Sequence, residues 1–204
     1  MPRHASIDRL CLVCILCFGC LLSPYVVSGE KIQDQEHDII KAAYLRNALK
    51  FTHWPKGTFK DTNSKVMIAV AGRQTSFSKA LTQAFRNLNF QIGNRRAKII
   101  KYNNVEEFKF ALEESNTGFQ VLYVQESEKE RTQEWLGAVK DQNVLLFSDS
   151  EGFLNKGGMI SLTPNPKVEK RYIYNIHLPS LKAKGIRLEN QFLRLRSVVN
   201  IISK

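Results

Sequence analysis

The side chains best suited to chemistry in this sequence are few and widely spaced. Beyond residue 29 the only histidines are His37, His53 and His177. None of them belongs to an HExxH pattern or to another close spacing of metal ligands. Asp149 follows a short apolar run, where a phosphoacceptor could lie, but a helix-cap or turn role is favoured. We therefore expect no catalytic residues, no metal site and no cofactor.

Other catalytic patterns are also missing. The carboxylate pairs Glu106-Glu107 and Glu113-Glu114 cannot act as paired acids, because neighbouring residues on a helix point in different directions. They are expected on a solvated face. The sequence has no GxSxG elbow, no P-loop and no GxGxxG after a strand. An exported enzyme is kept only as a third hypothesis, with the three histidines and Asp149 as its candidate residues.

Three short segments are candidates for binding. Trp54-Pro55 ends the first predicted helix, Gly157-Gly158 closes a short turn or helix at Phe153-Leu154 before a strand, and His177 ends a strand. Aromatic residues dominate interface energetics, which favours Trp54, although a core tryptophan closing the helix is an equal alternative. The two glycines could cradle an anion, but a tight turn is the better interpretation. We hypothesise that the three segments lie close together.

Residues 1–29 have the three parts of a secretory signal peptide: a basic start, an apolar run and small residues at its end. The apolar run from Leu10 to Leu22 is shorter than the roughly 20 residues that a membrane-spanning helix needs. Cleavage is expected near Ser28-Gly29, which leaves residues 30–204 as the exported chain. An uncleaved anchor and lipidation at Cys20 are the alternatives.

All four cysteines lie within this leader, so residues 30–204 contain none. The exported domain is therefore expected to be held by its core, without disulfides. Cysteine nucleophiles, iron–sulfur clusters and cysteine-based zinc sites are excluded from it.

The composition is that of a basic globular protein. The chain has 204 residues, of which 43% are hydrophobic and 24% charged, with a net charge of +11. Nine Lys or Arg residues and two Glu lie between Asn165 and Lys204. For an exported protein this charge favours an acidic protein surface or an anionic membrane over nucleic acid, which we do not expect as a partner. A merely solvated basic surface is the alternative.

Apolar runs of strand length alternate with helix-length periodic stretches, a rhythm typical of one α/β domain over residues 30–204. We expect a single domain in three layers, with a mixed, mostly parallel sheet flanked by helices. Expected helices span Gln33 to Phe51, Ser76 to Asn87, Val105 to Glu114, a segment opened by a Ser127/Glu130 capping box, and Asn190 to Ile201. Expected strands span Val66 to Ala71, Ala97 to Tyr102, Gln120 to Val124, Val144 to Phe147, Met159 to Leu162 and Val168 to Ile176. The buried face of the first helix is expected to hold Ile40, Tyr44, Asn47 and Phe51, with Ile39 and Ala43 alongside.

An ordered set of motifs resembles the YfiR/HmsC-like family. The segment from Lys41 to Pro55, with Asn47, His53 and Trp54, is similar to the family's opening helix. The run from Val66 to Gly72 is similar to its first strand. Later blocks resemble the family in order and spacing: Val144-Leu145-Leu146-Phe147-Ser148-Asp149, Gly157-Gly158-Met159-Ile160, Tyr174 to Leu178, and Gly185-Ile186-Arg187-Leu188.

The resemblance implies a non-enzymatic periplasmic α/β protein. It would bind the periplasmic sensing domain of an inner-membrane signalling protein, repress a diguanylate cyclase, and keep cyclic-di-GMP and biofilm formation low. A homodimer and contact with an anionic membrane surface are further expected associations. The expected partner- or ligand-binding residues are Asn47, His53, Trp54, Pro55, Asp149, Gly157, Gly158 and His177.

Two departures from the family pattern matter. The exported domain lacks the disulfide cysteines that family members often carry, so redox control through this chain is excluded. His177 stands where the family commonly has Asn, which puts a carried-over ligand role there in doubt. The alternative function is a periplasmic small-ligand-binding module that serves a sensor kinase or transporter.

Overall fold

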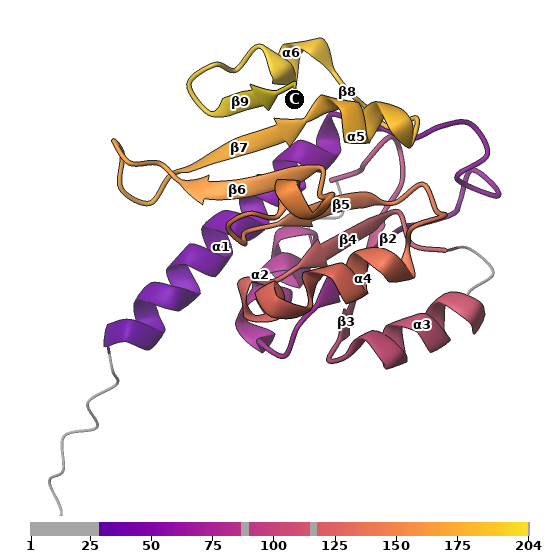
Figure 1. Cartoon of the computed structure of the whole chain (residues 1–204), viewed down its shortest axis with the longest axis horizontal. Helices are drawn as coiled ribbons and strands as arrows, with labels where there is room; N and C mark the ends of the chain where they lie inside the picture. The colour runs from indigo at the N-terminus through magenta and orange to yellow at the C-terminus, as the bar shows by residue number, and fades with distance from the viewer. Residues whose placement is uncertain (1–28, 87–89, 115–117, 204) are drawn as a thin grey trace, which may run out of the picture. The chain divides into compact units, whose positions relative to one another are not determined.

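A computed structural model describes residues 29–86, 90–114 and 118–203 (Figure 1). The predicted signal peptide lies outside the described residues except for Gly29, where helix α1 begins. Residues 34–204 form one compact unit, which holds the fold described below. None of the described helices is both long and apolar enough to cross a membrane.

The centre of the fold is a mixed sheet. Its seven strands among the described residues are ordered β3-β2-β4-β5-β6-β7-β9, and neighbours from β3 to β6 run parallel. Strand β7 is antiparallel to β6 and parallel to β9. The strands are β2 (Val66–Ala71), β3 (Ala97–Tyr102), β4 (Val121–Val124), β5 (Leu145–Ser148), β6 (Ile160–Pro164), β7 (Tyr172–His177) and β9 (Val199–Ile202). The predicted mixed, mostly parallel sheet is confirmed.

Helices cover both faces of the sheet, which gives three layers (Figure 1). Helix α2 (Thr75–Ala84) links β2 to β3, and α3 (Val105–Glu114) links β3 to β4 on the other side of β2. Right-handed crossovers in opposite directions place these two helices on opposite faces. Helix α4 (Thr132–Ala138) packs beside α3. Residues 34–50 of helix α1 (Gly29–Lys50) lie on the face of α2, where Asp38 contacts Ser76.

Each face of the sheet has its own aromatic core. Under α1 and α2, the fully buried Tyr123 stacks on Phe77 at 4.2 Å and on Phe147 at 5.7 Å between ring centroids. Under α3 and α4, Trp135 packs against Phe108 at 5.7 Å. Strands β2, β4 and β5 are apolar or aromatic except for the buried Ser148 at the end of β5, as expected of strands with both faces buried.

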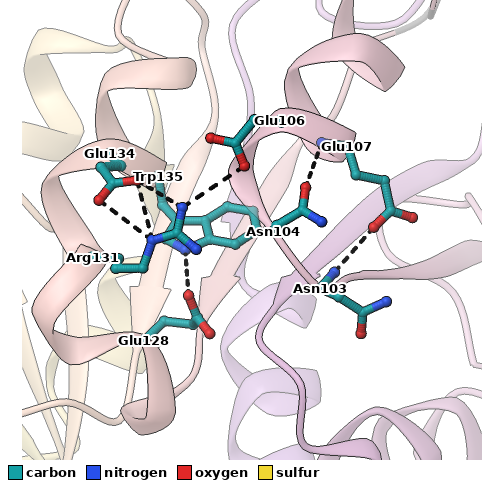
Figure 2. Close-up of polar contacts among 8 residues, drawn as sticks. All are labelled: Asn103, Asn104, Glu106, Glu107, Glu128, Arg131, Glu134 and Trp135. Atoms are coloured by element: carbon teal, nitrogen blue, oxygen red, sulfur yellow. Dashed lines mark hydrogen bonds and ion pairs between the residues drawn. The ribbon is translucent and has the colours of Figure 1, made fainter.

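Side-chain capping is found at helix α3 and not at the segment where it was predicted. The predicted Ser127/Glu130 capping box is wrong, because the 3₁₀ helix η1 (Glu126–Arg131) begins after Gln125 without a side-chain cap. The capping contacts lie at α3, where Asn104 Oδ1 accepts a hydrogen bond from the Glu107 backbone N–H at 2.8 Å (Figure 2). Such contacts satisfy backbone donors that have no partner within the helix.

A second polar group in Figure 2 joins η1 to α4. The Trp135 indole donates to the buried Glu128 carboxylate at 3.0 Å. On the surface, Arg131 pairs with Glu134 at 2.8 Å and with Glu106 of α3 at 3.8 Å. The acidic face predicted for α3 is therefore partly neutralised.

The predicted last helix, Asn190 to Ile201, is wrong. Helix α6 (Asn190–Leu193) has only four residues, and β9 follows it as the edge strand beside β7. The β-branched residues Val199, Ile201 and Ile202 favour a strand, and pairing with β7 satisfies their backbone. Other elements that were not predicted are α5 (Leu178–Ala183) and the pair β1 (Thr52–His53) and β8 (Arg187–Leu188). The short turn or helix expected before Gly157-Gly158 is the 3₁₀ helix η2 (Leu154–Lys156).

The buried face of α1 also differs from the predicted one. Ile39 is 52% exposed, and Ala43 and Asn47 are exposed as well. The side chains of α1 that the fold buries are Asp38, Ala42, Leu45, Ala48 and Leu49. The buried set is thus shifted by two positions from the predicted one, which brings Asp38 onto the sheet side. The predicted residues Ile40, Tyr44 and Phe51 are only partly buried against the core.

Candidate functional site

The predicted site residues lie at two opposite edges of the sheet. Because β2, β4, β5 and β6 run parallel, their carboxyl ends lie along one end of the sheet, which we call the carboxyl edge. Their amino ends lie along the opposite end, which we call the amino edge. Asp149 directly follows β5, at the carboxyl edge. Trp54 binds the residue before β4, and the His177 backbone N–H donates to the Met159 carbonyl before β6 at 2.9 Å. Trp54 and His177 therefore share the amino edge.

Trp54 is anchored rather than free. Its indole Nε1 donates to the Gln120 carbonyl at 3.2 Å, and its ring meets Phe59 edge-on at 5.8 Å. The side chain is half-buried, and so is that of Pro55, which lies against Gly185. Trp54 therefore packs partly against the core and stays partly accessible to solvent.

His53 lies beside Trp54 on the short strand β1. Its Nε2 is 3.0 Å from Glu189 Oε1, and both groups are accessible to solvent. Hydrogen bonds from Gln191 and from His53 lower the pKa of Glu189. Strand β1 pairs with β8 in the register His53↔Arg187, so this surface contains the cation Arg187 as well.

Gly157-Gly158 forms a turn at the amino edge. Gly157 has φ +99°, a left-handed conformation that favours glycine, and it ends η2. Gly158 lies so close to Phe153 that an added Cβ would come within 2.2 Å of that ring. The backbone conformation at Gly157 and the close packing at Gly158 therefore explain why glycine occupies each position, as expected for a tight turn.

His177 and Asn47 each bind within the fold. His177 ends β7, and its Nδ1 lies 2.6 Å from Ser180 Oγ at the start of α5. Asn47 hydrogen-bonds the Tyr174 hydroxyl, which itself donates to the Tyr44 carbonyl at 2.8 Å. Burial raises the pKa of Tyr174, and the hydrogen bond from Asn47 offsets part of that rise.

Asp149 holds three elements together at the carboxyl edge. One carboxylate oxygen is 2.6 Å from the Lys41 ammonium of α1, and the other accepts the Glu126 backbone N–H at the start of η1 at 3.0 Å. Both side chains of the ion pair are largely buried. Burial lowers the pKa of Lys41, but the charge and hydrogen bond of Asp149 more than compensate, so the pKa lies above its usual value.

Further polar groups that the sequence analysis missed surround this ion pair. Burial raises the pKa of Asp38, and a hydrogen bond with Ser76 and the charge of Lys41 offset part of the rise. His37 Nδ1 lies 2.8 Å from the Tyr172 hydroxyl, beside the same cluster. One sequence signal indicates that Asp38 is buried, because Asp38 shares a helical face with the apolar residues Ala42 and Leu45.

The side chains around Asp149 connect α1, β5 and η1 through contacts within the fold. The Lys41 ammonium is charged at neutral pH, and the Asp149 carboxylate that binds it also accepts the Glu126 backbone N–H. Within the described ranges, no three His, Cys, Asp or Glu side chains gather closely enough to hold a metal ion. The surface with the most accessible candidate residues is therefore the one around Trp54, at the amino edge.

Comparisons with known proteins identify a family and a related fold. A family model described as YfiR/HmsC-like matches residues 38–196. No curated protein matches the chain. An ABC domain in complex with L-Trp from Streptococcus pneumoniae is 10% identical with a TM-score of 0.52, over 81% of this chain and 60% of that one. A conserved domain protein from Vibrio cholerae O1 biovar El Tor strain N16961 is 9% identical with a TM-score of 0.48, over 68% and 55%. This chain thus spans less than two thirds of the length of either solved chain, and the first similarity concerns the fold alone.

Proposed function

The chain belongs to the YfiR/HmsC-like family, and from this premise we propose that it restrains an inner-membrane diguanylate cyclase from the periplasm. The family supports a regulatory role in cyclic-di-GMP signalling. The observation that carries the proposal is the family match over residues 38–196, which runs from α1 to beyond α6 and includes every candidate site residue. The leader-like residues 1–29 support export, with cleavage near Ser28-Gly29.

Restraint requires a preference between two states of the partner. A repressor shifts its partner only by binding the inactive state more tightly than the active one. Moving an equilibrium from 1:99 to 99:1 takes about 5.5 kcal/mol of such preference. A protein interface of roughly 1,200–2,000 Å² is large enough to supply it. The chain therefore needs no chemistry of its own, in keeping with a family whose role is regulatory.

We place the partner-binding surface around Trp54, at the amino edge. The Trp54 ring is already fixed by Gln120 and Phe59, so little side-chain freedom would be lost on binding. His53 and Lys56 beside it are exposed, and Pro55 is half-buried. A rigid aromatic surrounded by accessible polar groups is typical of an interface centre.

The experiment is photocrosslinking from two matched positions in living cells. A photoreactive amino acid at exposed Lys56 reports on the Trp54 surface, and one at exposed Glu151 reports on the carboxyl edge. We expect Lys56 to yield a product with a membrane protein that carries a diguanylate cyclase domain, joined through its periplasmic segment. Capture of that protein only from Glu151 would contradict the chosen surface. A failure of both positions to capture any cyclase would contradict the proposed function.

A further inference from the structure

An apolar hollow lies near the C-terminus, between α5, β8 and α6. Its volume is about 670 Å³, within the range of known ligand sites. It is lined by Leu178, Pro179, Leu181, Lys182, Gly185, Ile186, Arg187, Leu188, Leu193 and Ser203. Apart from two cations and a serine, the lining consists of glycine, proline and aliphatic residues. Such a hollow offers little to orient a polar ligand and suits a hydrocarbon chain.

A second hollow adjoins the first at Leu193. Its volume is about 570 Å³, and it is lined by Asn190, Leu193, Arg194, Arg196, Val199, Asn200 and Ile201. Leu195 and Ile201 at this end of the chain are 42% and 41% exposed. Large apolar side chains thus stand in solvent beside arginines. We call the two hollows together the C-terminal surface.

The C-terminal surface is strongly basic. Four cations line it, Lys182, Arg187, Arg194 and Arg196, and no Asp or Glu lines either hollow. Within the described part of the chain, none of these four forms an ion pair. The neighbouring acid, Glu189, is bound by His53 and Gln191. The surface therefore presents uncompensated positive charge around an apolar recess.

We propose that the C-terminal surface docks on an anionic phospholipid bilayer, with one acyl chain in the apolar hollow and the lipid phosphate beside Lys182 and Arg187. Cations gain free energy near an anionic membrane, and exposed Leu195 and Ile201 can enter the headgroup boundary. The long stems of Lys and Arg let their charges reach phosphates while their methylenes cover apolar surface. A soluble anion would use the cations but would leave the exposed leucine and isoleucine unexplained.

This surface adjoins the proposed partner-binding surface through the β1–β8 pair, in which His53 stands opposite Arg187. The inference nevertheless stands apart from the proposed function, since lipid binding is measured without a cyclase. A failure of lipid binding would leave the cyclic-di-GMP proposal intact. An unchanged cyclic-di-GMP level in a deletion strain would leave the lipid-binding proposal intact.

The first experiment compares vesicles. The exported chain, purified from cells, is sedimented with vesicles of 30% phosphatidylglycerol in phosphatidylcholine, and with pure phosphatidylcholine. We expect binding only to the anionic vesicles, and about thirty-fold weaker binding for Lys182→Gln/Arg187→Gln, at roughly fivefold per cation. The matched control is Lys65→Gln/Lys98→Gln, which removes the same charge from exposed lysines elsewhere and should stay within a few-fold of wild type. Equal losses in the two variants would overturn the proposal, because charge alone would then explain binding.

The second experiment tests the acyl chain. Titration calorimetry with monomeric lysophosphatidylglycerol of 14 or 12 carbons should show about fifteen-fold tighter binding of the longer chain, at about fourfold per buried methylene. Leu193→Trp, which fills the hollow from its rim, should abolish this difference while the melting temperature shows that the chain is folded. If Leu193→Trp fails to fold, Pro179→Glu at the exposed rim replaces it. An affinity that does not depend on the length of the lipid acyl chain would overturn the proposal that this chain binds in the apolar hollow.

Discussion

The Lys41 ammonium lies 2.6 Å from the Asp149 carboxylate and ties the first helix to the end of β5, across 108 residues of sequence. The same carboxylate accepts the Glu126 backbone N–H, so one side chain orients α1, β5 and η1. Asp149 thus occupies the strand-end position where ligands often bind in α/β proteins, but it is engaged within the fold.

Breaking this ion pair should destabilise the protein. Lys41→Met leaves a largely buried carboxylate without its cation, and we expect a loss of about 2 kcal/mol in the free energy of unfolding. Removal of one partner from a fully buried pair costs about 3–5 kcal/mol, and Lys41 retains some solvent access. Urea denaturation of Lys41→Met, Asp149→Asn and the double variant measures the coupling. Strictly additive losses would show that the two residues do not act as a pair.

The buried Asp38 should make stability depend on pH in a defined direction. Because burial raises its pKa in the folded state, folding favours the protonated form, and stability falls as the pH rises through the folded-state pKa. Lys41, Asp149, Asp34 and the Ser76 hydroxyl are the groups that act on it.

Asp38→Asn removes this penalty and can keep a hydrogen bond with Ser76. We expect a higher melting temperature than wild type at pH 7, with a gap that closes as the pH falls below about 4, the ordinary Asp range. Asp34→Asn, at an exposed position of the same helix, is the control and should show no comparable gap. A lower melting temperature for Asp38→Asn at pH 7 would mean that its charge stabilises the fold.

The close approach of Gly158 to Phe153 should make this glycine intolerant of a side chain. Gly158→Ala would place Cβ within 2.2 Å of the Phe153 ring, and we expect a loss of about 1–3 kcal/mol from overpacking. Phe153→Leu in the same chain should recover part of that loss. Gly137→Ala is the control, since Gly137 lies in α4 with open space around it and should gain roughly 0.5–1 kcal/mol.

The Trp54 surface should matter for regulation rather than only for folding. Trp54→Ala removes a half-exposed aromatic from the proposed interface, and we expect cyclic-di-GMP to rise toward the level of a deletion strain. Phe110→Ala removes an aromatic that is 66% exposed on α3 and should leave cyclic-di-GMP unchanged. Immunoblots must show equal amounts of the two variants. Equal behaviour of the two variants would place the interface elsewhere.

Elements governed by local pattern could be predicted from the sequence. The apolar runs at β2, β4 and β5 signal strands buried on both faces. Pro166 signals the connection between β6 and β7, but the predicted bounds there are wrong, because Pro164 still pairs within β6 and the strand expected from Val168 begins only at Tyr172. The end of the chain could not be predicted in this way. Phe192, Leu195 and Val199 fit a helical spacing, whereas Val199 and Ile201 fit the alternation of a strand, and pairing with β7 decides between the two.

The candidate site was harder to predict because its parts meet only in the folded chain. Asp149 was recognisable as a strand-end residue, but its partner Lys41 lies in the first helix, and no local pattern links the two. His53 and Glu189 meet only because β1 pairs with β8, and each of these strands has two residues. Strands that short carry no periodicity, so their pairing is a tertiary event.

The central claim is tested most directly by intracellular cyclic-di-GMP in a deletion strain, compared with the parent, with a strain complemented by the full chain, and with one complemented by residues 30–204 alone. We predict a rise on deletion that the full chain reverses and that the leaderless chain does not, because restraint is exerted from the periplasm. An unchanged cyclic-di-GMP level on deletion, with the protein shown to be expressed in the parent, would contradict the account.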